Sequence, residues 1–186
     1  ILLASNSPRR RELLAGLDID YRVTALPEVD ESYPDTLSGE EIPLYISQEK
    51  AAAYRRFMKD NTLLITADTI VWLDGKVYGK PRDIADAKAM LQALSGKTHT
   101  VITGVTLTSL QKQISFTVST EVTFAALGDD EIDYYVEKYR PLDKAGAYGV
   151  QEWIGYIGVT GLKGSYYNVM GLPIQRLYTE LSLIHI

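Results

Sequence analysis

One stretch of the chain, from Thr62 to Leu73, predicts a strand that is apolar on both of its faces. Leu63-Leu64-Ile65 and Ile70-Val71-Trp72 flank an Asp68-Thr69 pair in its middle. A strand that is buried on both faces is typical of the centre of a sheet covered by helices. This stretch therefore favours an α/β fold with a buried central strand.

Segments with strand or helix patterns surround this strand along the 186 residues. Asp74-Gly75 predicts a tight hairpin, and residues 111–113 predict the turn of a long antiparallel one. Ser38 and Glu41 have the spacing of a capping box, although Pro43 favours a helix start nearer Ile42. Strands are expected at 1–3, 21–26, 76–79, 99–110, 114–126 and 153–159, and helices at 10–16, 38–58, 84–94, 130–139 (capped by Asp129) and 174–183. The pattern is mixed α/β, and the length suits one domain, or two small lobes that share a sheet.

Composition argues against several kinds of site. The chain has no cysteine, which excludes disulfides, thiol catalysis and cysteine-ligated metals. Its two histidines argue against a histidine-based zinc site, and a Ser-His-Asp triad would depend on His99 in a strand-like run. A net charge of −5 argues against a broad nucleic-acid surface but not against a small phosphorylated ligand. With no apolar run of membrane-spanning length and no signal peptide pattern, we expect a soluble intracellular protein with no membrane partner.

The residues that follow the first strand predict an anion site. Ser7 is a good N-cap and Pro8 suits the first position of a helix. Ser5 lies in the turn before this helix, and Arg9, Arg10 and Arg11 follow. Free backbone N–H groups at a helix N-terminus, together with arginine side chains, can bind phosphate oxygens. The alternative is an ordinary capped helix with solvated arginines.

Asp68 is the main candidate for chemistry. A carboxylate in the middle of an apolar strand is costly to bury unless it binds a cation or meets solvent in a cleft. The alternative is an aspartate that is hydrogen-bonded to neighbouring amides. Two lysines are further candidates: Lys50, in an alanine-rich helix, and Lys80, which precedes Pro81. Either could be a solvated charge, or the two could neutralise a polyphosphate together with Arg9. Glu31 and Asp68 together have the oxygen ligands of a Mg²⁺ site.

Eight blocks of sequence, in order and across nearly the whole chain, resemble the Maf family of nucleoside triphosphate pyrophosphatases. The blocks are Ser5–Arg10, Val29–Ser32, Glu49–Ala51, Ala67–Val71, Gly79–Arg82, Leu94–His99, Asp143–Gln151 and Gly164–Pro173. Asn6 departs from the family, which more often has glycine or alanine there. Asparagine tolerates left-handed backbone, so we expect the turn to be retained.

The resemblance implies a fold like that of the inosine triphosphate pyrophosphatases. This fold has a long, bent mixed sheet with flanking helices, and two lobes around a cleft. Residues 1–186 are expected to form one such domain, which contains both lobes. The resemblance also implies a cytoplasmic, often dimeric enzyme that hydrolyses a nucleoside triphosphate to the monophosphate and pyrophosphate with a divalent metal, Mg²⁺ or Mn²⁺. Thr69 and Gln151 match the dTTP/UTP pyrophosphatase subgroup.

Position by position, the resemblance assigns roles to individual residues. Asp68 corresponds to the proton acceptor, which would act directly on water or through bound metal, and Glu31 would help to hold the metal. Arg9, Lys50 and Lys80 would neutralise phosphate charge, with Arg10 as a weaker candidate and Ser5 in the phosphate turn. The amide of Gln151 would contact the O4/N3 edge of uracil or thymine. Four aromatic residues are expected mainly to pack in the core, although they could stack on a base: Tyr148, Trp153, Tyr166 and Tyr167.

Two other functions are considered. The same chemistry could act on 7-methyl-GTP or on nucleotides with other modified bases, in keeping with a housekeeping role. The chain could instead bind nucleotides as a regulator of septum formation, although every catalytic position of the family pattern is filled. A substrate panel separates these possibilities.

Overall fold

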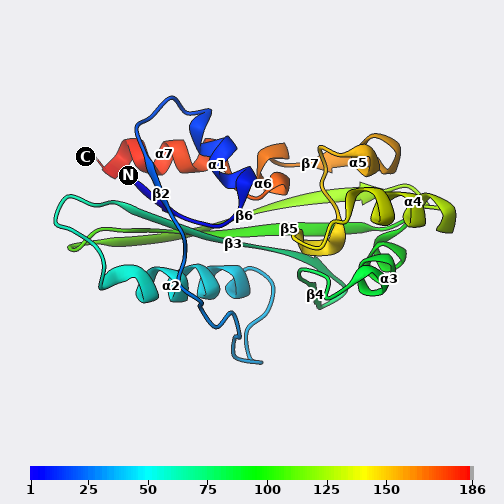
Figure 1. The fold of residues 1–186 in the computed structure, drawn as a ribbon, viewed down its shortest axis with the longest axis horizontal. Helices are drawn as coiled ribbons and strands as arrows, with labels where there is room; N and C mark the ends of the chain where they lie inside the picture. Colours follow the sequence, from blue (N-terminus) through cyan, green and yellow to red (C-terminus); the bar gives the residue numbers. More distant parts are fainter. Residues whose placement is uncertain (185–186) are drawn as a thin grey trace. The chain divides into compact units, whose positions relative to one another are not determined.

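The computed structural model, which describes residues 1–184, contains a seven-stranded sheet with flanking helices (Figure 1). β1 runs parallel to β2 and to β3, whereas β4 is antiparallel to β3 and β7 is antiparallel to β6. The sheet is therefore mixed, as the sequence predicts. Its order is β2 (Arg22–Thr24), β1 (Leu2–Ala4), β3 (Leu64–Leu73), β5 (Thr98–Thr108), β6 (Gln113–Phe124) and β7 (Val159–Lys163), with β4 (Lys76–Tyr78) beside β3.

The helices lie between and after these strands along the chain. They are α1 (Pro8–Ala15), α2 (Glu41–Arg55), α3 (Ile84–Leu94), α4 (Asp129–Tyr139), α5 (Trp153–Gly158), α6 (Tyr166–Met170) and α7 (Ile174–Ile184), with a 3-10 turn η1 at Ala145–Ala147. None of the helices within residues 1–184 combines the length and the apolar character needed to cross a membrane.

The chain divides into two compact units, and β3, β5 and β6 contribute residues to both. The first unit contains residues 1–68, 103–118 and the C-terminal part from Gly171. In this unit α2 lies on one face of the strands, and α1 and α7 lie on the other (Figure 1). Gly104 of β5 allows α2 to approach closely, because a Cβ atom there would lie 2.4 Å from the carbonyl carbon of Pro43.

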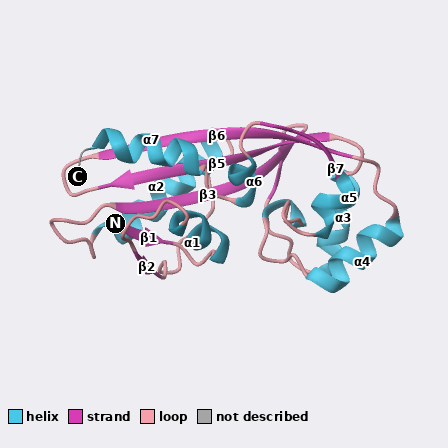
Figure 2. Cartoon of the chain, turned by 90° about the horizontal axis from the view of Figure 1, so that it is seen from above, coloured by secondary structure: helices cyan, strands magenta, loops and turns pink. Residues whose placement is uncertain are grey.

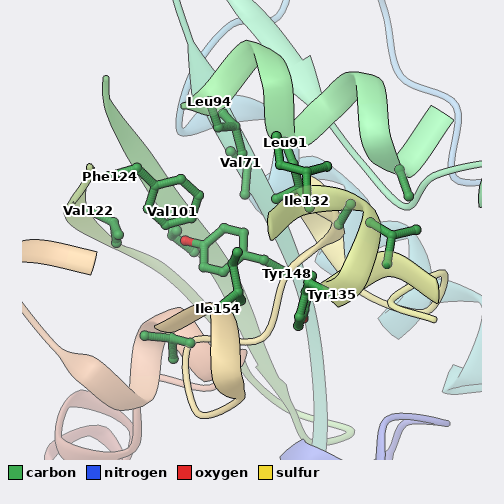
Figure 3. Close-up of a cluster of buried hydrophobic side chains, with 14 of the residues drawn as sticks. Val71, Leu91, Leu94, Val101, Val122, Phe124, Ile132, Tyr135, Tyr148 and Ile154 are labelled. Carbon is green, nitrogen blue, oxygen red and sulfur yellow. The ribbon is translucent and has the colours of Figure 1, made fainter. Parts of the chain in front are cut away.

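The second unit contains residues 69–102 and 119–170. Figure 2 shows its helices α3, α4 and α5 grouped together, and α3 packs against α4. Burying the apolar side chains of these helices and strands provides the main stabilisation of this unit. Its core contains, among others, Val71, Leu91, Leu94, Val101, Val122, Phe124, Ile132, Tyr135, Tyr148 and Ile154 (Figure 3).

Several predictions from local sequence are confirmed. Ser7 caps α1 through its hydroxyl, and Pro8 is the first helical residue. Asp74 and Gly75, with φ angles of 50° and 75°, form the turn between β3 and β4. β5 and β6 are neighbours in the sheet, joined by a turn in which the Ser109 N–H donates to the Lys112 carbonyl.

Other predictions of elements are corrected. Residues 153–158, within the range expected to be a strand, form the helix α5. Gly155 lies so close to the Val150 carbonyl that any side chain there would clash, so glycine allows this helix to pack against the preceding turn. The aromatic and β-branched residues of this segment favour a strand, but tertiary packing outweighs that preference. Asp129 is the first residue of α4, and Gly128 occupies the N-cap position with its N–H bonded to Glu131. The strand expected at 21–26 and the helix expected at 38–58 are shorter in the structure.

Candidate active site

The turn between β1 and α1 has the geometry that the sequence predicts. The Ser5 hydroxyl accepts a hydrogen bond from the Ser7 N–H at 3.1 Å, and the Ser7 hydroxyl accepts one from the Arg10 N–H at 3.4 Å. Arg11 donates to the Ser5 carbonyl at 3.2 Å. Ser5 is therefore a buried part of a rigid turn, and Arg11 is used to hold that turn.

Arg10 extends from α1 and is held from the other end of the chain. Its Nε donates a 2.8 Å hydrogen bond to the carbonyl of Gly171, the residue 161 positions away that precedes Leu172-Pro173 and α7. Burial lowers the pKa of the Arg10 guanidinium, and the neighbouring Arg9 does so too, whereas the carboxylates of Asp68 and Glu31 act in the opposite direction. Arg10, the weaker candidate from sequence, is therefore a full member of a charged cluster.

Lys50 connects α2 to this cluster. Its ammonium nitrogen lies 3.0 Å from Oδ1 of Asp68 and 3.0 Å from Oε1 of Glu31, and it donates to the Ala67 carbonyl at 3.3 Å. The residue is only 5% exposed. The sequence left open whether Lys50 is a solvated charge, and the structure shows that it is a buried ion-pair partner.

Hydrogen bonds fix α2 against the sheet next to Lys50. The hydroxyl of Thr66 on β3 donates to the Ser47 carbonyl at 2.7 Å. The Ser47 hydroxyl lies 2.8 Å from that of Thr106 on β5, and both groups are buried. Because these contacts lie one turn before Lys50, they hold the lysine over the neighbouring Asp68.

Asp68 is 8% exposed in the middle of β3. Burial raises the pKa of its carboxyl above the ordinary value, while the ammonium of Lys50 and the guanidinium of Arg10 act in the opposite direction. A buried carboxylate without such cations would be very costly. The structure favours the cation-binding interpretation of Asp68 over an aspartate held by neighbouring amides, because the charged side chain of Lys50 donates a hydrogen bond to its carboxylate.

Glu31 reaches the cluster from the acidic loop between β2 and α2, with half of its side chain exposed. The carboxylate of Asp30 accepts a 2.9 Å hydrogen bond from the Ser32 N–H, which shapes this loop and lowers the pKa of Asp30. The structure thus brings together five of the predicted site residues: Arg9, Arg10, Glu31, Lys50 and Asp68.

The donor set fits a small oxygen-ligated cation. The carboxylates of Glu31 and Asp68 converge on one point, which the Lys50 ammonium contacts. Within residues 1–184, no group of three or more carboxylate or imidazole side chains forms a ready-made metal site. Two carboxylates suit Mg²⁺, which commonly takes one or two protein ligands and completes its shell with water and substrate phosphates.

Three further predicted site residues belong to the second unit: Thr69, Lys80 and Gln151. Lys80 is exposed, and the carbonyl of the preceding Gly79 accepts a 3.1 Å hydrogen bond from the Gly146 N–H. Gln151 lies in a turn before α5, and its side-chain oxygen Oε1 is buried without a hydrogen-bond partner in the described structure. Such a buried acceptor is rare unless a ligand or water satisfies it.

The aromatic candidates divide into two groups. Tyr148 is fully packed in the core of the second unit, and Trp153 packs against that core with its ring 4.8 Å from that of Tyr134. Tyr166 and Tyr167 are 41% and 50% exposed, so the expectation that they pack in the core is wrong.

Comparison with known proteins supports the sequence resemblance. Residues 1–184 match the family model described as "Maf-like protein". Proteins named "dTTP/UTP pyrophosphatase" from Phocaeicola vulgatus, Porphyromonas gingivalis strain W83 and Flavobacterium psychrophilum are 67%, 55% and 49% identical to the chain. Each match covers 97% of this chain and 92–94% of the relative.

A solved structure shares the fold. It is titled "The structure of the Staphylococcus aureus Ham1 protein", has a TM-score of 0.53 at 19% identity, and the match covers 96% of this chain and 98% of that one. This likeness confirms the predicted fold class.

Proposed function

We propose, because the chain belongs to the Maf-like protein family, that it is a nucleoside triphosphate pyrophosphatase that hydrolyses dTTP and UTP to the monophosphate and pyrophosphate. The relatives that share 49–67% of its residues over nearly the whole chain carry that name. One structural observation supports the chemistry best: a buried carboxylate, Asp68, lies among the cationic groups of Lys50 and Arg10.

Asp68 would act as the general base. Burial raises the pKa of its carboxyl, which makes it a stronger proton acceptor than an exposed aspartate. In the proposed step the oxygen of a water molecule bonds to the α-phosphorus, and a proton of that water passes to Asp68. The bond between the α-phosphorus and the bridging α–β oxygen breaks, and pyrophosphate leaves.

The cations would stabilise the charge that develops on the phosphates. Lys50 and Arg10 are held by the protein, at the Asp68 carboxylate and the Gly171 carbonyl respectively, so they need little rearrangement when substrate binds. Phosphoryl transfer depends mainly on such positioned charge. Arg9 and Lys80 are proposed as additional phosphate contacts, and Ser5 as part of the turn that presents them.

A divalent metal, Mg²⁺ or Mn²⁺, would be held by Glu31 and Asp68. It would supply positive charge to the phosphate oxygens and lower the pKa of a bound water. Glu31 suits this role because its side chain is half exposed at the cluster, so it can exchange Lys50 for another cation with little loss of packing.

The proposed base preference depends on Gln151. Its buried Oε1 is an acceptor that needs a donor, and the imide N3–H of uracil or thymine is one. Its NH₂ group can donate to the O4 oxygen of the same base. Thr69 is proposed as a second specificity residue from the subgroup resemblance alone.

Two broader features are proposed from the family resemblance: a cytoplasmic location and a homodimer. Cell fractionation and light scattering on the purified protein test them. A nucleic-acid polymer is not expected as a partner because the net charge is −5.

Hydrolysis of dTTP in water labelled with ¹⁸O tests the reaction. Attack at the α-phosphorus places the label in dTMP and none in pyrophosphate. Label in released inorganic phosphate, with dTDP as the other product, would contradict the proposal. Binding of nucleotide without any hydrolysis would favour the regulator instead.

A further inference from the structure

Tyr135 on α4 joins two separate points of the loop that carries Gln151. Its phenol oxygen accepts a 3.0 Å hydrogen bond from the Gly149 N–H and donates a 2.9 Å hydrogen bond to Oε1 of Glu152. The side chain has no exposed surface, so water does not compete for these two bonds.

The two points are the ends of one β-turn. The Glu152 N–H donates to the Gly149 carbonyl at 3.0 Å, which closes a four-residue turn with Val150 and Gln151 in its middle. The hydroxyl of Tyr135 therefore bonds to the first and to the last residue of the turn that presents Gln151.

We propose that Tyr135 is a positioning residue that holds the Gln151 turn in the conformation that recognises a pyrimidine base. This inference rests on the proposed function, in which Gln151 contacts the base. Tyr135 would then determine substrate preference from α4, without contacting the substrate itself.

The surroundings of the turn support a fixed conformation. A Cβ atom at Gly149 would lie 2.4 Å from Oε1 of Glu152, so glycine is required for the carboxylate to come this close. Lys144 binds the same carboxylate oxygen at 3.4 Å. Gly155 lies directly against the Val150 carbonyl, which packs the start of α5 against the turn.

The position of the Tyr135 ring does not depend on its hydroxyl. The ring lies in the buried cluster shown in Figure 3 and stacks on Tyr139 at a centroid distance of 5.1 Å. Removal of the hydroxyl alone should therefore keep the core and release the turn. Gln151 would then be less often in its binding conformation, which raises KM for substrates that need it.

The test compares Tyr135→Phe with Tyr134→Phe, the same chemical change one residue earlier on α4, where the hydroxyl is exposed and bonds to Lys138. Two quantities are measured: the kinetics of pyrophosphate release from dTTP and dATP, and the hydrogen exchange of the Gly149 amide. For Tyr135→Phe we expect faster exchange at Gly149 and a roughly five- to tenfold higher KM for dTTP, with kcat nearly unchanged. The dTTP-to-dATP ratio of kcat/KM should fall by the same factor, and Tyr134→Phe should match the wild type.

An unchanged dTTP-to-dATP ratio in Tyr135→Phe, or an equal loss of kcat for both substrates, would overturn the inference. Glu152→Ala provides a second variant if Tyr135→Phe does not fold, because it removes the acceptor of the same hydroxyl, and the same change in ratio is expected. The wild-type enzyme distinguishes a failure of the proposed function from a failure of this inference. No preference for dTTP in the wild type would contradict the proposed function, whereas a wild-type preference that survives both variants would contradict this inference alone.

Discussion

Lys50 on α2 places its ammonium nitrogen 3.0 Å from Oδ1 of Asp68 on β3, and the two residues are 5% and 8% exposed. Taking both charges out of water costs free energy that their attraction only partly returns, so a buried pair of this kind is weak evidence of stability. The arrangement is better explained by chemistry, because it holds a buried, oriented carboxylate beside cations where a phosphate could bind.

Replacement of Asp68 by asparagine keeps the size of the side chain and removes the base. We expect kcat to fall by about 10²- to 10⁴-fold, the usual contribution of a general base. The variant should remain folded, because Glu31 still pairs with Lys50, and dTTP affinity should be retained within a few-fold. Circular dichroism and titration calorimetry check these two points. A variant that turns over at the wild-type rate would remove Asp68 from the mechanism.

Replacement of Lys50 by methionine leaves Asp68 buried without its main cation. We expect the free energy of unfolding to fall by roughly 3–5 kcal/mol near neutral pH. The folded-state pKa of Asp68 should rise, because burial and Glu31 both raise it and Lys50 no longer opposes them. The folded state then binds a proton more readily than the unfolded state, so the deficit should shrink as the pH falls through that raised pKa.

Lys88→Met is the matched control, because Lys88 contacts Asp133 and Glu137 at the surface between α3 and α4. Exposed pairs of this kind contribute about 1 kcal/mol or less. Urea unfolding of both variants at several pH values measures the difference. An equal fall in the free energy of unfolding for the two variants would show that the Lys50–Asp68 pair contributes no more than an exposed ion pair.

Gln151→Glu replaces the amide donor of Gln151 by a carboxylate. The variant loses the bond to O4 of the base and places a negative charge at a buried atom, so kcat/KM for dTTP and UTP should fall by about 10- to 100-fold. Hydrolysis of dATP should change much less, because the proposed contact is specific to the pyrimidine edge. Competition assays with mixed nucleotides measure the preference, and an unaltered preference would remove Gln151 from base recognition.

His99 should make the second unit sensitive to acid. Burial lowers the pKa of His99 to about 4, and its Nε2 lies 2.7 Å from the Tyr148 hydroxyl. The unfolded chain binds this proton near pH 6.5, so stability should be lost as the pH falls from about 6.5 to about 4, by roughly 3 kcal/mol in total. His99→Gln should show a correspondingly shallower loss of stability over this range in thermal unfolding. Identical pH profiles for the variant and the wild type would contradict the assignment.

Local sequence signals predicted much of the fold. Ser7-Pro8 at the start of α1 and Asp74-Gly75 between β3 and β4 form the cap and the turn expected of them, because those residues act on their immediate neighbours. Residues 153–158 show the limit of such signals. Their aromatic and β-branched residues favour a strand, whereas the observed helix packs against the preceding turn, with Gly155 next to the Val150 carbonyl, and local sequence does not predict that packing.

The chemistry of the candidate site was predicted from residue types, but its geometry was not. Asp68 was singled out because a carboxylate interrupts an apolar strand, and Glu31 was only a possible partner until the structure placed both at Lys50. Arg10 is the weaker candidate from sequence, and its anchor, the Gly171 carbonyl, is 161 residues away, where a local pattern does not reveal it. The role of Tyr135 was missed entirely, since nothing in the α4 sequence indicates that this tyrosine bonds to the Gln151 turn.

The most direct test of the account is pyrophosphate release from dTTP, UTP, CTP, GTP, ATP and 7-methyl-GTP, measured side by side with Mg²⁺ or Mn²⁺. The account predicts fast release from dTTP and UTP and slow release from the others. CTP and ATP lack the ring N–H that the Gln151 acceptor needs, and the subgroup resemblance predicts slow release from the guanine nucleotides. Release from 7-methyl-GTP alone would keep the mechanism and contradict the specificity argument. No release from any of them would contradict the assignment of this cluster as a pyrophosphatase site.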